Sequence, residues 1–490
     1  MAAAARDLKA NGRIAVMKST TAISAQMNDT AGIGTLSSHH IREAAARMRN
    51  LRSGNPADTA RSLAKALDAW RGRDFAPRRA TVAAIAAAWG YSERLLEASF
   101  DALLAPFTDE SLAVCAATMA INLAKDAVEQ AEGRGIGGDI IGMIMPGNLP
   151  GAGLHEVLVG LLSGRSLILK TPLAEPFFFA SFDRTLRKFD EALGNRLEVF
   201  TWGREREDLT AVMCANCDWL AAFGDDITLE RLRGYGQYSP NGSSPGNEGN
   251  KGLKAEFGLR FSGAYIAEDP LAIANDRQRQ SAIIDALALD VSLFEQAGCL
   301  SPHHIFVEDR ARQGRAGRAS DEKVARGKAY DFAAALAEAL ERLTISLPPP
   351  GWLGLENAAA LRRVRESARW RALGGAPVTM WEGERLGWTV VYDEEALFTP
   401  SPGFRTVTVS PVGGIGDFER RLAPVDGRLE AFAVAGSDVD EVKRCLAERG
   451  ASYLCAPGAM QSPPLDWRHG GGRFLDALLT HRRISDEERV

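Results

Sequence analysis

Cysteine and long hydrophobic runs are both scarce in this sequence. Its 490 residues include six cysteines, which are too few and too scattered for a disulfide framework. No apolar run approaches the roughly 20 residues that a membrane-spanning helix needs. The formal net charge of −5 gives no reason to expect a nucleic acid as partner. These absences point to a soluble globular protein, and a reducing cytoplasm is its expected compartment.

The first 55 residues contain neither a sustained apolar stretch nor a recognisable cleavage site, so they do not have the form of a secretory signal. We expect residues 1–55 to form a flexible tail. Because the segment is rich in alanine and carries arginine, an organelle transit peptide is the alternative.

Cys214 and Cys217 form a C-x-x-C pair. A zinc site needs two further cysteine or histidine ligands at suitable spacing, and none lies nearby in the sequence. The pair is therefore interpreted as small side chains packed before a strand, and no metal site is predicted.

The chain has a helical first part and a longer part in which strands and helices alternate. From about 58 to 131, apolar residues recur every three or four positions, which predicts helices. Short apolar runs at 139–146, 166–170, 197–202 and 218–224 then alternate with helical patterns. Such alternation is typical of a parallel sheet with helices on both faces. A second α/β stretch begins near residue 253.

The segment FEQAGCLSPHHIFVE (294–308) places Cys299 in a loop between a helical pattern and a strand pattern. The small neighbour Gly298 would let a carbonyl group approach the sulfur. A thiolate is a strong nucleophile and, once acylated, a good leaving group, so it suits acyl chemistry. A cysteine in such a place is more often a packing residue, so Cys299 alone does not establish a site.

Three more residues occupy positions where chemistry is plausible. Asn148, in the turn PGNLPG (146–151), can donate to an oxyanion near a helix start. Lys170 ends a strand pattern, at the edge where α/β sheets bind ligands. Glu256 precedes Gly258 and another strand pattern. Each also has an ordinary interpretation, as a turn asparagine, a solvated lysine or a surface carboxylate. No GxxxxGK[ST] phosphate loop is present, and GIGGDIIG precedes its strand instead of following it.

These four elements, in this order, resemble the aldehyde dehydrogenase superfamily. Four segments resemble more specifically the acyl-CoA reductase family, which is typified by the fatty acid reductase of bioluminescent bacteria: PGNLPG, CLSPHHIFVE, SPGFRTVTVSPVG and QSPPLDWRHGGGRFLDALL. The resemblance runs from about residue 130 to the C-terminus.

The resemblance implies an aldehyde dehydrogenase-like α/β fold, with two Rossmann-like parallel-sheet domains and a helical N-terminal region. Residues 56–252 plus 427–490 are expected to form the nicotinamide cofactor-binding domain. Residues 253–426 are expected to form the catalytic domain that carries the nucleophilic cysteine.

The resemblance also implies roles for three catalytic residues. Cys299 is the nucleophile, and Asn148 donates to the oxyanion together with the Cys299 backbone N–H. Glu256 manages protons, since the equivalent residue activates water in hydrolytic relatives.

For the cofactor, the resemblance places Lys170 and Gly224 at a bound nicotinamide dinucleotide. It places Glu395 near the nicotinamide ribose, with Glu394 an alternative in register. Relatives often carry a glutamate for the adenosine ribose three residues after the lysine, where this chain has Leu173. Asp225 stands where a small hydroxyl residue is usual; it suits a helix cap but would repel a pyrophosphate. NADPH or NADH is expected, with NADPH favoured.

The implied activity is NAD(P)H-dependent reduction of an acyl-CoA, expected to be fatty acyl, to the aldehyde through a thioester on Cys299. One alternative is oxidation of an aldehyde to the acid or the acyl-CoA. Another is a non-catalytic subunit that binds an acyl-transferring partner. The family implies acyl-protein synthetase and thioesterase partners, and relatives commonly form homo-oligomers. Neither a nucleic-acid partner nor a membrane span is expected.

Overall fold

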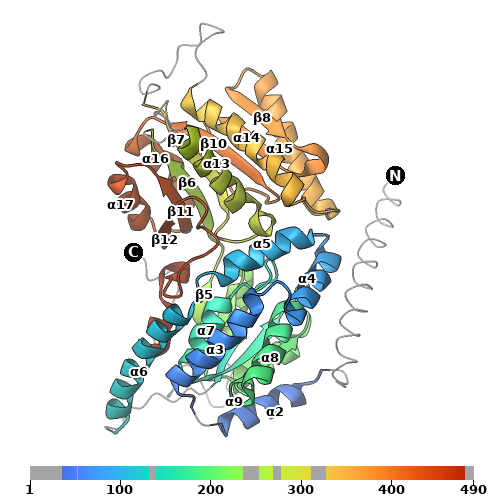
Figure 1. Ribbon diagram of the computed structural model, residues 1–490, viewed down its shortest axis with the longest axis vertical. Helices are drawn as coiled ribbons and strands as arrows, with labels where there is room; N and C mark the ends of the chain where they lie inside the picture. The colour runs from blue at the N-terminus through green and yellow to red at the C-terminus, as the bar shows by residue number, and fades with distance from the viewer. Residues whose placement is uncertain are drawn as a thin grey trace. The chain divides into compact units, whose positions relative to one another are not determined.

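The computed structural model describes residues 36–51, 53–131, 140–235, 253–268, 277–310 and 327–480. These residues form two units, each of which is described by itself (Figure 1). Of the described residues, the first unit contains those up to Trp89, those of Phe107–Gly258 and helix α18 (Phe474–Thr480). The second unit contains Gly90–Pro106 and Leu259–Arg473.

The first unit is built on a five-stranded sheet in the order β3-β2-β1-β4-β5, with every neighbouring pair parallel. The strands are short and mainly apolar, as expected for a sheet covered on both faces. Their bounds are β1 (Ile140–Ile144), β2 (Ser166–Thr171), β3 (Leu197–Thr201), β4 (Trp219–Phe223) and β5 (Leu253–Phe257). The order reverses between β1 and β4, which is the switch point where sheets of this kind bind ligands at their carboxyl edge.

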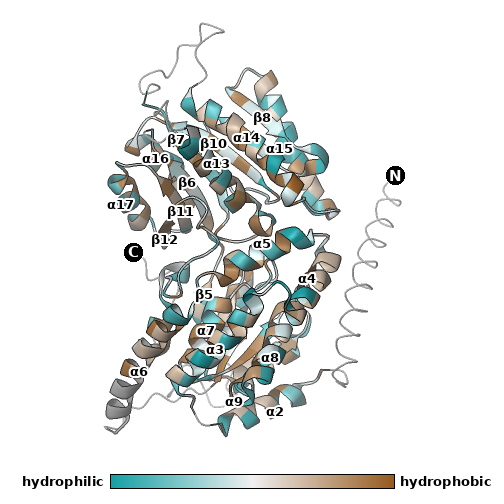
Figure 2. Ribbon diagram, viewed as in Figure 1, coloured by the Kyte–Doolittle hydropathy of each residue, from teal (hydrophilic) through white to brown (hydrophobic). Residues whose placement is uncertain are grey.

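Helices cover both faces of this sheet (Figure 1). On one face, α2 (Ser38–Arg49), α10 (Glu207–Asn216) and α11 (Asp226–Tyr235) share an apolar cluster with alternate strand residues. On the other, α7 (Leu154–Leu162) packs on β2 and α8 (Phe177–Phe189) packs on β3. The remaining helices are α3 (Pro56–Arg71), α4 (Ala76–Trp89), α6 (Asp109–Ala131) and α9 (Glu191–Gly194). In Figure 2 the helices carry both teal and brown residues, whereas the strands between them are mainly brown.

The second unit contains a seven-stranded sheet in the order β12-β11-β6-β7-β10-β9-β8. All neighbours are parallel except β8 and β9. The bounds are β6 (Phe261–Ile266), β7 (Pro302–Glu308), β8 (Val378–Glu382), β9 (Thr389–Asp393), β10 (Thr406–Val412), β11 (Leu429–Ala435) and β12 (Tyr453–Cys455).

Alternate residues of this sheet face two different helix layers. Ala264 and Ile266 face α13 (Arg277–Ser292) and α14 (Lys328–Ser346). Phe261 and Tyr265 face α16 (Ile415–Leu422) and α17 (Asp440–Glu448). Successive side chains of a strand point to opposite faces of the sheet. Because helices cover both faces, both sets of side chains are apolar. Helix α15 (Leu355–Leu373) packs on β8, and α5 (Glu93–Leu104) packs on the short helix η1 (Leu293–Gln296).

The predicted α/β fold with two parallel-sheet domains is confirmed, but two of the predicted boundaries are wrong. Residues 427–473 belong to the second unit, because β11 pairs with β6 and extends that sheet. Residues 90–106 also belong to it, since α5 packs on η1.

The prediction of a flexible tail over residues 1–55 is wrong for the part that the structure describes, which includes helix α2. Residues 1–35, and with them most of the segment considered as a transit peptide, lie outside the described residues. Helix α2, however, buries Ile41, Ala45 and Met48 in the apolar cluster of the first unit. Its apolar residues recur every three or four positions, which is an ordinary helix signal. The overall composition of the segment does not show this pattern.

Within the described residues, no single helix is long and apolar enough to cross a membrane. One pair of helices joined by a bend, Glu93–Leu104 and Asp109–Ile121, is together long and apolar enough to cross a membrane, by length and composition only. The first of these helices buries Leu95, Leu96 and Phe100 completely, as a core helix does.

Candidate active site

Cys299 lies in a turn between η1 and β7, as the sequence predicts, and its side chain is half-buried. The three residues Phe294, Glu295 and Gln296 before this turn have positive φ angles of 53°, 52° and 61°. Three consecutive non-glycine residues in the left-handed region are unfavourable and persist only where surrounding contacts hold them. Contacts with other segments therefore hold the backbone before Cys299 in an unfavourable conformation.

Those contacts come from segments that are distant in sequence. Glu295 and Arg405 form an ion pair at 2.6 Å, and neither side chain has any exposed area. Gln296 donates to the carbonyls of Pro302 at 2.6 Å and Thr406 at 2.8 Å, and accepts from the Thr406 N–H at 2.8 Å. The segment SPGFRTVTVSPVG, which carried part of the resemblance, thus supports the turn before Cys299.

The carbonyl of Cys299 is anchored as well. It accepts a hydrogen bond from the Ser262 hydroxyl at 2.5 Å, and that hydroxyl accepts one from the Ala431 N–H at 2.9 Å. Ser262 belongs to β6 and Ala431 to β11, so two neighbouring strands of the sheet fix the position of the nucleophile.

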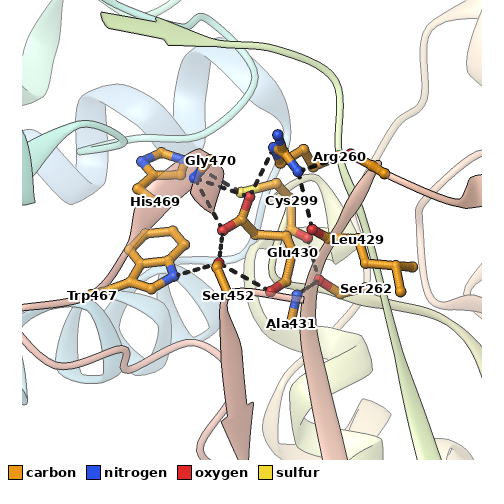
Figure 3. A network of polar contacts seen from close by, with 11 residues as sticks. Arg260, Ser262, Cys299, Leu429, Glu430, Ala431, Ser452, Trp467, His469 and Gly470 are labelled. Carbon is orange, nitrogen blue, oxygen red and sulfur yellow. Dashed lines mark hydrogen bonds and ion pairs between the residues drawn. The ribbon is translucent and has the colours of Figure 1, made fainter. Parts of the chain in front are cut away.

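The histidine that contacts Cys299 is His469, near the C-terminus of the second unit (Figure 3). The distance from the Cys299 Sγ to the His469 Nε2 is 4.0 Å, at the outer limit of a hydrogen bond to sulfur. The imidazole lies on the indole of Trp467, with ring centroids 4.2 Å apart and 15° between the planes. Sequence reasoning noted the segment QSPPLDWRHGGG as a family feature and assigned it no role.

A buried carboxylate fastens this segment to the sheet. Glu430 has no exposed area, and its two oxygens accept from the Gly470 N–H, each at 3.3 Å. It also accepts from the Ser452 hydroxyl, and Arg260 forms an ion pair with it at 3.4 Å. Figure 3 shows these groups around the carboxylate, with the thiol of Cys299 and the imidazole of His469 beside them.

The histidines nearest to Cys299 in sequence, His303 and His304, make hydrogen bonds to other residues. His303 accepts from the Ser401 N–H at 2.8 Å, and burial lowers its pKa to about 4. His304 is within hydrogen-bonding distance of the Ser410 hydroxyl at 2.9 Å, and burial lowers its pKa to about 3. Both imidazoles are neutral at ordinary pH and are engaged in packing and hydrogen bonds.

The residues predicted for the cofactor and the oxyanion stand at the carboxyl edge of the first sheet. Asn148 is exposed in the loop after β1, six residues before α7 begins. Lys170 is the penultimate residue of β2, and burial lowers its pKa. Gly224 follows β4, where a Cβ would come 2.8 Å from the Thr228 side chain. Because Asn148 and Cys299 belong to different units, the oxyanion role of Asn148 stays a prediction.

Glu256 is buried at the end of β5, where Arg233 of α11 covers its carboxylate. The Arg233 Nε donates to both oxygens at 3.1 Å, and Nη2 donates to one of them at 2.6 Å. Both oxygens are thus hydrogen-bonded to one guanidinium, which fixes the orientation of the carboxylate. No local pattern predicts this pair, because the two residues are 23 positions apart on different elements.

Glu394 and Glu395 follow β9 in the second unit. The Glu394 carboxylate accepts from the Tyr392 hydroxyl at 3.1 Å, while Glu395 is exposed. Its exposed carboxylate keeps Glu395 the better candidate for contact with a ribose.

The first sheet has features that suit a nicotinamide dinucleotide. Its strand order and switch point are those of dinucleotide-binding folds, and the ammonium of Lys170 suits a ribose hydroxyl or phosphate. The start of α11 suits a phosphate less, because the Asp225 carboxylate already accepts the Thr228 N–H there at 2.8 Å. That hydrogen bond and the Thr228 side chain keep the pKa of Asp225 below its usual value.

The C-x-x-C pair is a packing feature, as predicted. Cys214 and Cys217 are 4% and 0% exposed and belong to the apolar cluster beneath α2 and α10. Burial raises the pKa of the Cys214 thiol to about 12. Among the described residues, no group of three or more histidine, cysteine or acidic side chains is placed to hold a metal ion.

Solved structures that share this fold include aldehyde dehydrogenases. The chain is 12% identical to aldehyde dehydrogenase 21 from Physcomitrella patens, solved with the reaction product succinate, with a TM-score of 0.58 over 91% of this chain and 89% of that one. It is 12% identical to an NAD-dependent benzaldehyde dehydrogenase from Corynebacterium glutamicum, with a TM-score of 0.55 over 87% and 86%. HpcC from Thermus thermophilus is 16% identical, with a TM-score of 0.55 over 86% and 78%. No curated protein sequence matches the chain.

A family model described as acyl-CoA reductase (LuxC) matches residues 57–481, which is most of the chain. The family and the fold together support an oxidoreductase that acts on aldehyde groups, with an acyl substrate and a nicotinamide cofactor. The turn before Cys299, the half-buried thiol and the three family segments around it fit this assignment. The chain belongs to the acyl-CoA reductase (LuxC) family.

Proposed function

We propose that this protein reduces a fatty acyl-CoA to the aldehyde through a thioester on Cys299, with NADPH as the preferred reductant. The observation that carries the proposal is the setting of Cys299 in a member of this family. The thiol is half-buried, its carbonyl is fixed by Ser262, and an imidazole contacts its sulfur. A fixed, accessible thiol beside a base is the arrangement that nucleophilic catalysis requires.

In the first half of the reaction, the Cys299 Sγ attacks the thioester carbonyl of the acyl-CoA, and the bond to the CoA sulfur breaks. We propose that Asn148 and the Cys299 backbone N–H stabilise the oxyanion, each donor lowering the barrier by roughly 3 kcal/mol. In the second half, a bound reduced nicotinamide would supply a hydride to the acyl carbon. The Cys299 sulfur then leaves as the thiolate, and the aldehyde is released.

The pairing of Glu256 favours reduction over oxidation to an acid. Formation of an acid from the thioester requires a base that activates water, which is the role that the resemblance assigns to Glu256. Here both of its oxygens accept hydrogen bonds from Arg233, so the carboxylate is oriented toward the guanidinium and away from a water molecule. An enzyme that hydrolysed its own thioester slowly would leave time for hydride transfer.

For the cofactor, we propose that Lys170 holds the adenosine ribose or its phosphate, that Gly224 lies against the cofactor, and that Glu395 contacts the nicotinamide ribose. No carboxylate competes with a 2′-phosphate on the loop after Lys170. Position 173 is an exposed leucine, and Glu175 is buried, with its carboxylate accepting the N–H groups of Phe177 and Phe178 at the start of α8. This arrangement supports NADPH.

The test is a panel of acyl-CoA substrates of increasing chain length, assayed with NADPH and with NADH by cofactor absorbance and by aldehyde detection. We expect the wild type to form aldehyde and Cys299→Ala to be inactive. Labelled acyl-CoA should acylate the wild type at Cys299. Turnover by Cys299→Ala equal to that of the wild type would refute the thioester. Acid as the main product of aldehyde and NADP⁺, without reduction of any acyl-CoA, would favour the oxidative alternative.

A further inference from the structure

We propose that His469 is the proton acceptor and donor for the Cys299 sulfur, and that Glu430 is the residue that positions it. This inference rests on the proposed function, because it concerns the same nucleophile. Its first support is the contact itself, in which the imidazole Nε2 lies 4.0 Å from Sγ (Figure 3). Contacts of this kind are often long before substrate binds and shorten in the reacting complex.

The second support is that His469 belongs to a segment that the fold holds in place. Gly470 and Gly471 have φ angles of 66° and 89°, a conformation that glycine adopts without strain. This sharp turn brings the Gly470 N–H onto both oxygens of Glu430, each at 3.3 Å. The Glu430 carboxylate would be costly to bury without partners, and it has three of them: Gly470, the Ser452 hydroxyl and Arg260.

The third support is that one strand fixes both members of the pair. Glu430 and Ala431 are consecutive residues of β11. The carboxylate of Glu430 holds the segment that carries His469, and the N–H of Ala431 holds Ser262, which in turn binds the carbonyl of Cys299. The sulfur and the imidazole are therefore positioned by neighbouring points of the same backbone, which limits their relative movement.

The fourth support is the indole under the imidazole. Trp467 stacks on His469 at 4.2 Å, and its Nε1–H donates to the Ser452 hydroxyl at 3.1 Å, which itself donates to Glu430. The same polar network thus holds the ring on which His469 lies. The face of an indole favours a cation above it, so this stacking stabilises the protonated imidazole.

The competing bases are otherwise engaged. Burial keeps His303 and His304 neutral, and each makes its own hydrogen bond. Glu256 is held by Arg233 in the first unit. In the described part of the second unit, His469 is the imidazole that contacts the sulfur.

The proton can be followed through the cycle. In the resting pair, the Cys299 proton moves to the His469 Nε2, which leaves a thiolate and an imidazolium. The thiolate forms a bond to the acyl carbon, the bond from that carbon to the CoA sulfur breaks, and the imidazolium gives its proton to that sulfur. After hydride is added to the acyl carbon, the bond to Cys299 breaks, the aldehyde leaves as the thiolate re-forms, and His469 takes one proton from water.

The experiment compares wild type, His469→Ala and Glu430→Gln in the full-length protein without substrate, using iodoacetamide alkylation of Cys299 from pH 5.5 to 9.5. Alkylation requires the thiolate, so a base that takes the thiol proton speeds the reaction most at a pH where the free thiolate is scarce. We expect wild type to react about tenfold faster than His469→Ala at pH 6.5, with the rates converging near pH 9.5. Glu430→Gln should give an intermediate profile, since the amide keeps an acceptor but loses the charge.

The second measurement is single-turnover acylation of Cys299 by an acyl-CoA, followed by intact mass. His469→Ala should acylate about 100-fold more slowly or worse, and added imidazole should restore part of the rate. His39→Ala, at an exposed position of the first unit, is the matched control and should behave as wild type. Circular dichroism of each variant checks folding, and the rescue by imidazole distinguishes a chemical role from a structural one.

The outcomes separate the two proposals. If His469→Ala keeps the wild-type alkylation profile and acylation rate while the wild type makes aldehyde, the role of His469 is refuted and the proposed function stands. If no acyl-CoA acylates the wild type but its alkylation profile depends on His469, the proposed function is refuted. The inference that His469 exchanges a proton with the Cys299 sulfur then still stands.

Discussion

The candidate cofactor residues of the first unit lie at the carboxyl edge of its sheet, whereas the groups around Cys299 lie at the amino edge of the second sheet. In the first unit, Asn148, Lys170 and Gly224 follow or end strands at the carboxyl edge of the sheet, and they are exposed or half-buried. In the second unit, the groups around Cys299 stand at the amino ends of β6, β7, β11 and β12, which are neighbours in the sheet. These strands begin side by side, so residues far apart in sequence meet there.

The two edges also differ in how they hold charge. Around Cys299 three charged side chains are fully buried, since Glu295, Arg405 and Glu430 have no exposed area. At the first edge the Arg233 side chain is 34% exposed, although its partner Glu256 is only 4% exposed. Buried charge fixes geometry at a high cost if a partner is lost, whereas exposed charge is tolerant of change. If the proposed function holds, the buried charges around Cys299 would maintain one geometry, and the first edge would tolerate more change.

The sharpest test of this difference is to remove the arginine of each pair. Arg405→Met leaves the Glu295 carboxylate buried without its cation and should lower the free energy of unfolding by about 3–5 kcal/mol. Arg233→Met should cost about 1 kcal/mol, because water can reach the Glu256 carboxylate from the exposed side of its partner. Urea unfolding followed by circular dichroism measures both.

The control for that experiment is the double variant Glu295→Leu/Arg405→Met. Removing both charges should recover much of the stability, since an apolar pair of similar volume is often neutral. Equal losses for the two single arginine variants would remove the distinction between the units.

A smaller effect is expected from two aspartates that titrate in opposite directions. Burial raises the pKa of Asp290 to about 7, although its oxygens accept the N–H groups of Gly458 at 2.6 Å and Met460 at 3.2 Å. A carboxyl group whose pKa is higher in the folded state stabilises the fold at low pH, and this contribution disappears as the pH rises through about 7. Asp225 of the first unit, whose pKa is lowered, contributes above its unfolded pKa and loses that contribution in acid.

Asp290→Asn should remove this pH dependence from the second unit. Between pH 5 and pH 8, the difference in unfolding free energy between wild type and Asp290→Asn should change by about 2–3 kcal/mol, with the variant gaining at high pH. Thermal midpoints at a series of pH values measure it. Asp225→Asn is the matched variant, whose difference from wild type should stay constant between pH 5 and pH 8 and change only in acid. Parallel curves for wild type and Asp290→Asn would mean that Asp290 is ionised in the folded protein.

The sequence predicted the first edge better than the second for a physical reason. Strand ends can be read from apolar runs, and ligand sites at the carboxyl ends of parallel strands follow a general rule. Lys170 was proposed in this way, whereas Gly224 was placed at the cofactor by the resemblance. Cys299 was found by its loop position and by resemblance, and its place between η1 and β7 is confirmed.

His469, Glu430 and Arg260 were missed because their relation depends on strand order. β11 lies between β6 and β12 in the sheet but follows β10 in the chain, and no local pattern shows this. The same ignorance of strand order led to the wrong boundary at residue 427. The run His-Gly-Gly-Gly at 469–472 was the one available signal, since a glycine-rich turn beside a histidine favours a close approach.

The first edge offers a test of cofactor choice. Leu173 is 42% exposed on the loop after Lys170. A carboxylate at this position would accept a hydrogen bond from the ribose 2′-hydroxyl of NADH and repel the 2′-phosphate of NADPH. Leu173→Glu should therefore move the ratio of kcat/KM for NADPH to that for NADH about tenfold toward NADH, which corresponds to roughly 1.4 kcal/mol. Leu173→Gln controls for the loss of the leucine, and an unchanged ratio in Leu173→Glu would place the adenosine ribose elsewhere.

The smallest expected effect concerns Glu256, the residue that the resemblance makes a base. If Arg233 occupies its carboxylate during turnover as it does in this structure, Glu256→Gln should change the rate of aldehyde formation by less than about threefold, whereas loss of a general base typically costs 100-fold or more. Acid production from the thioester should be equally low in wild type and variant, as measured by mass analysis of the products. A 100-fold loss of aldehyde in Glu256→Gln would show that the carboxylate leaves Arg233 during the reaction, and would make the first unit as exacting in its charges as the second.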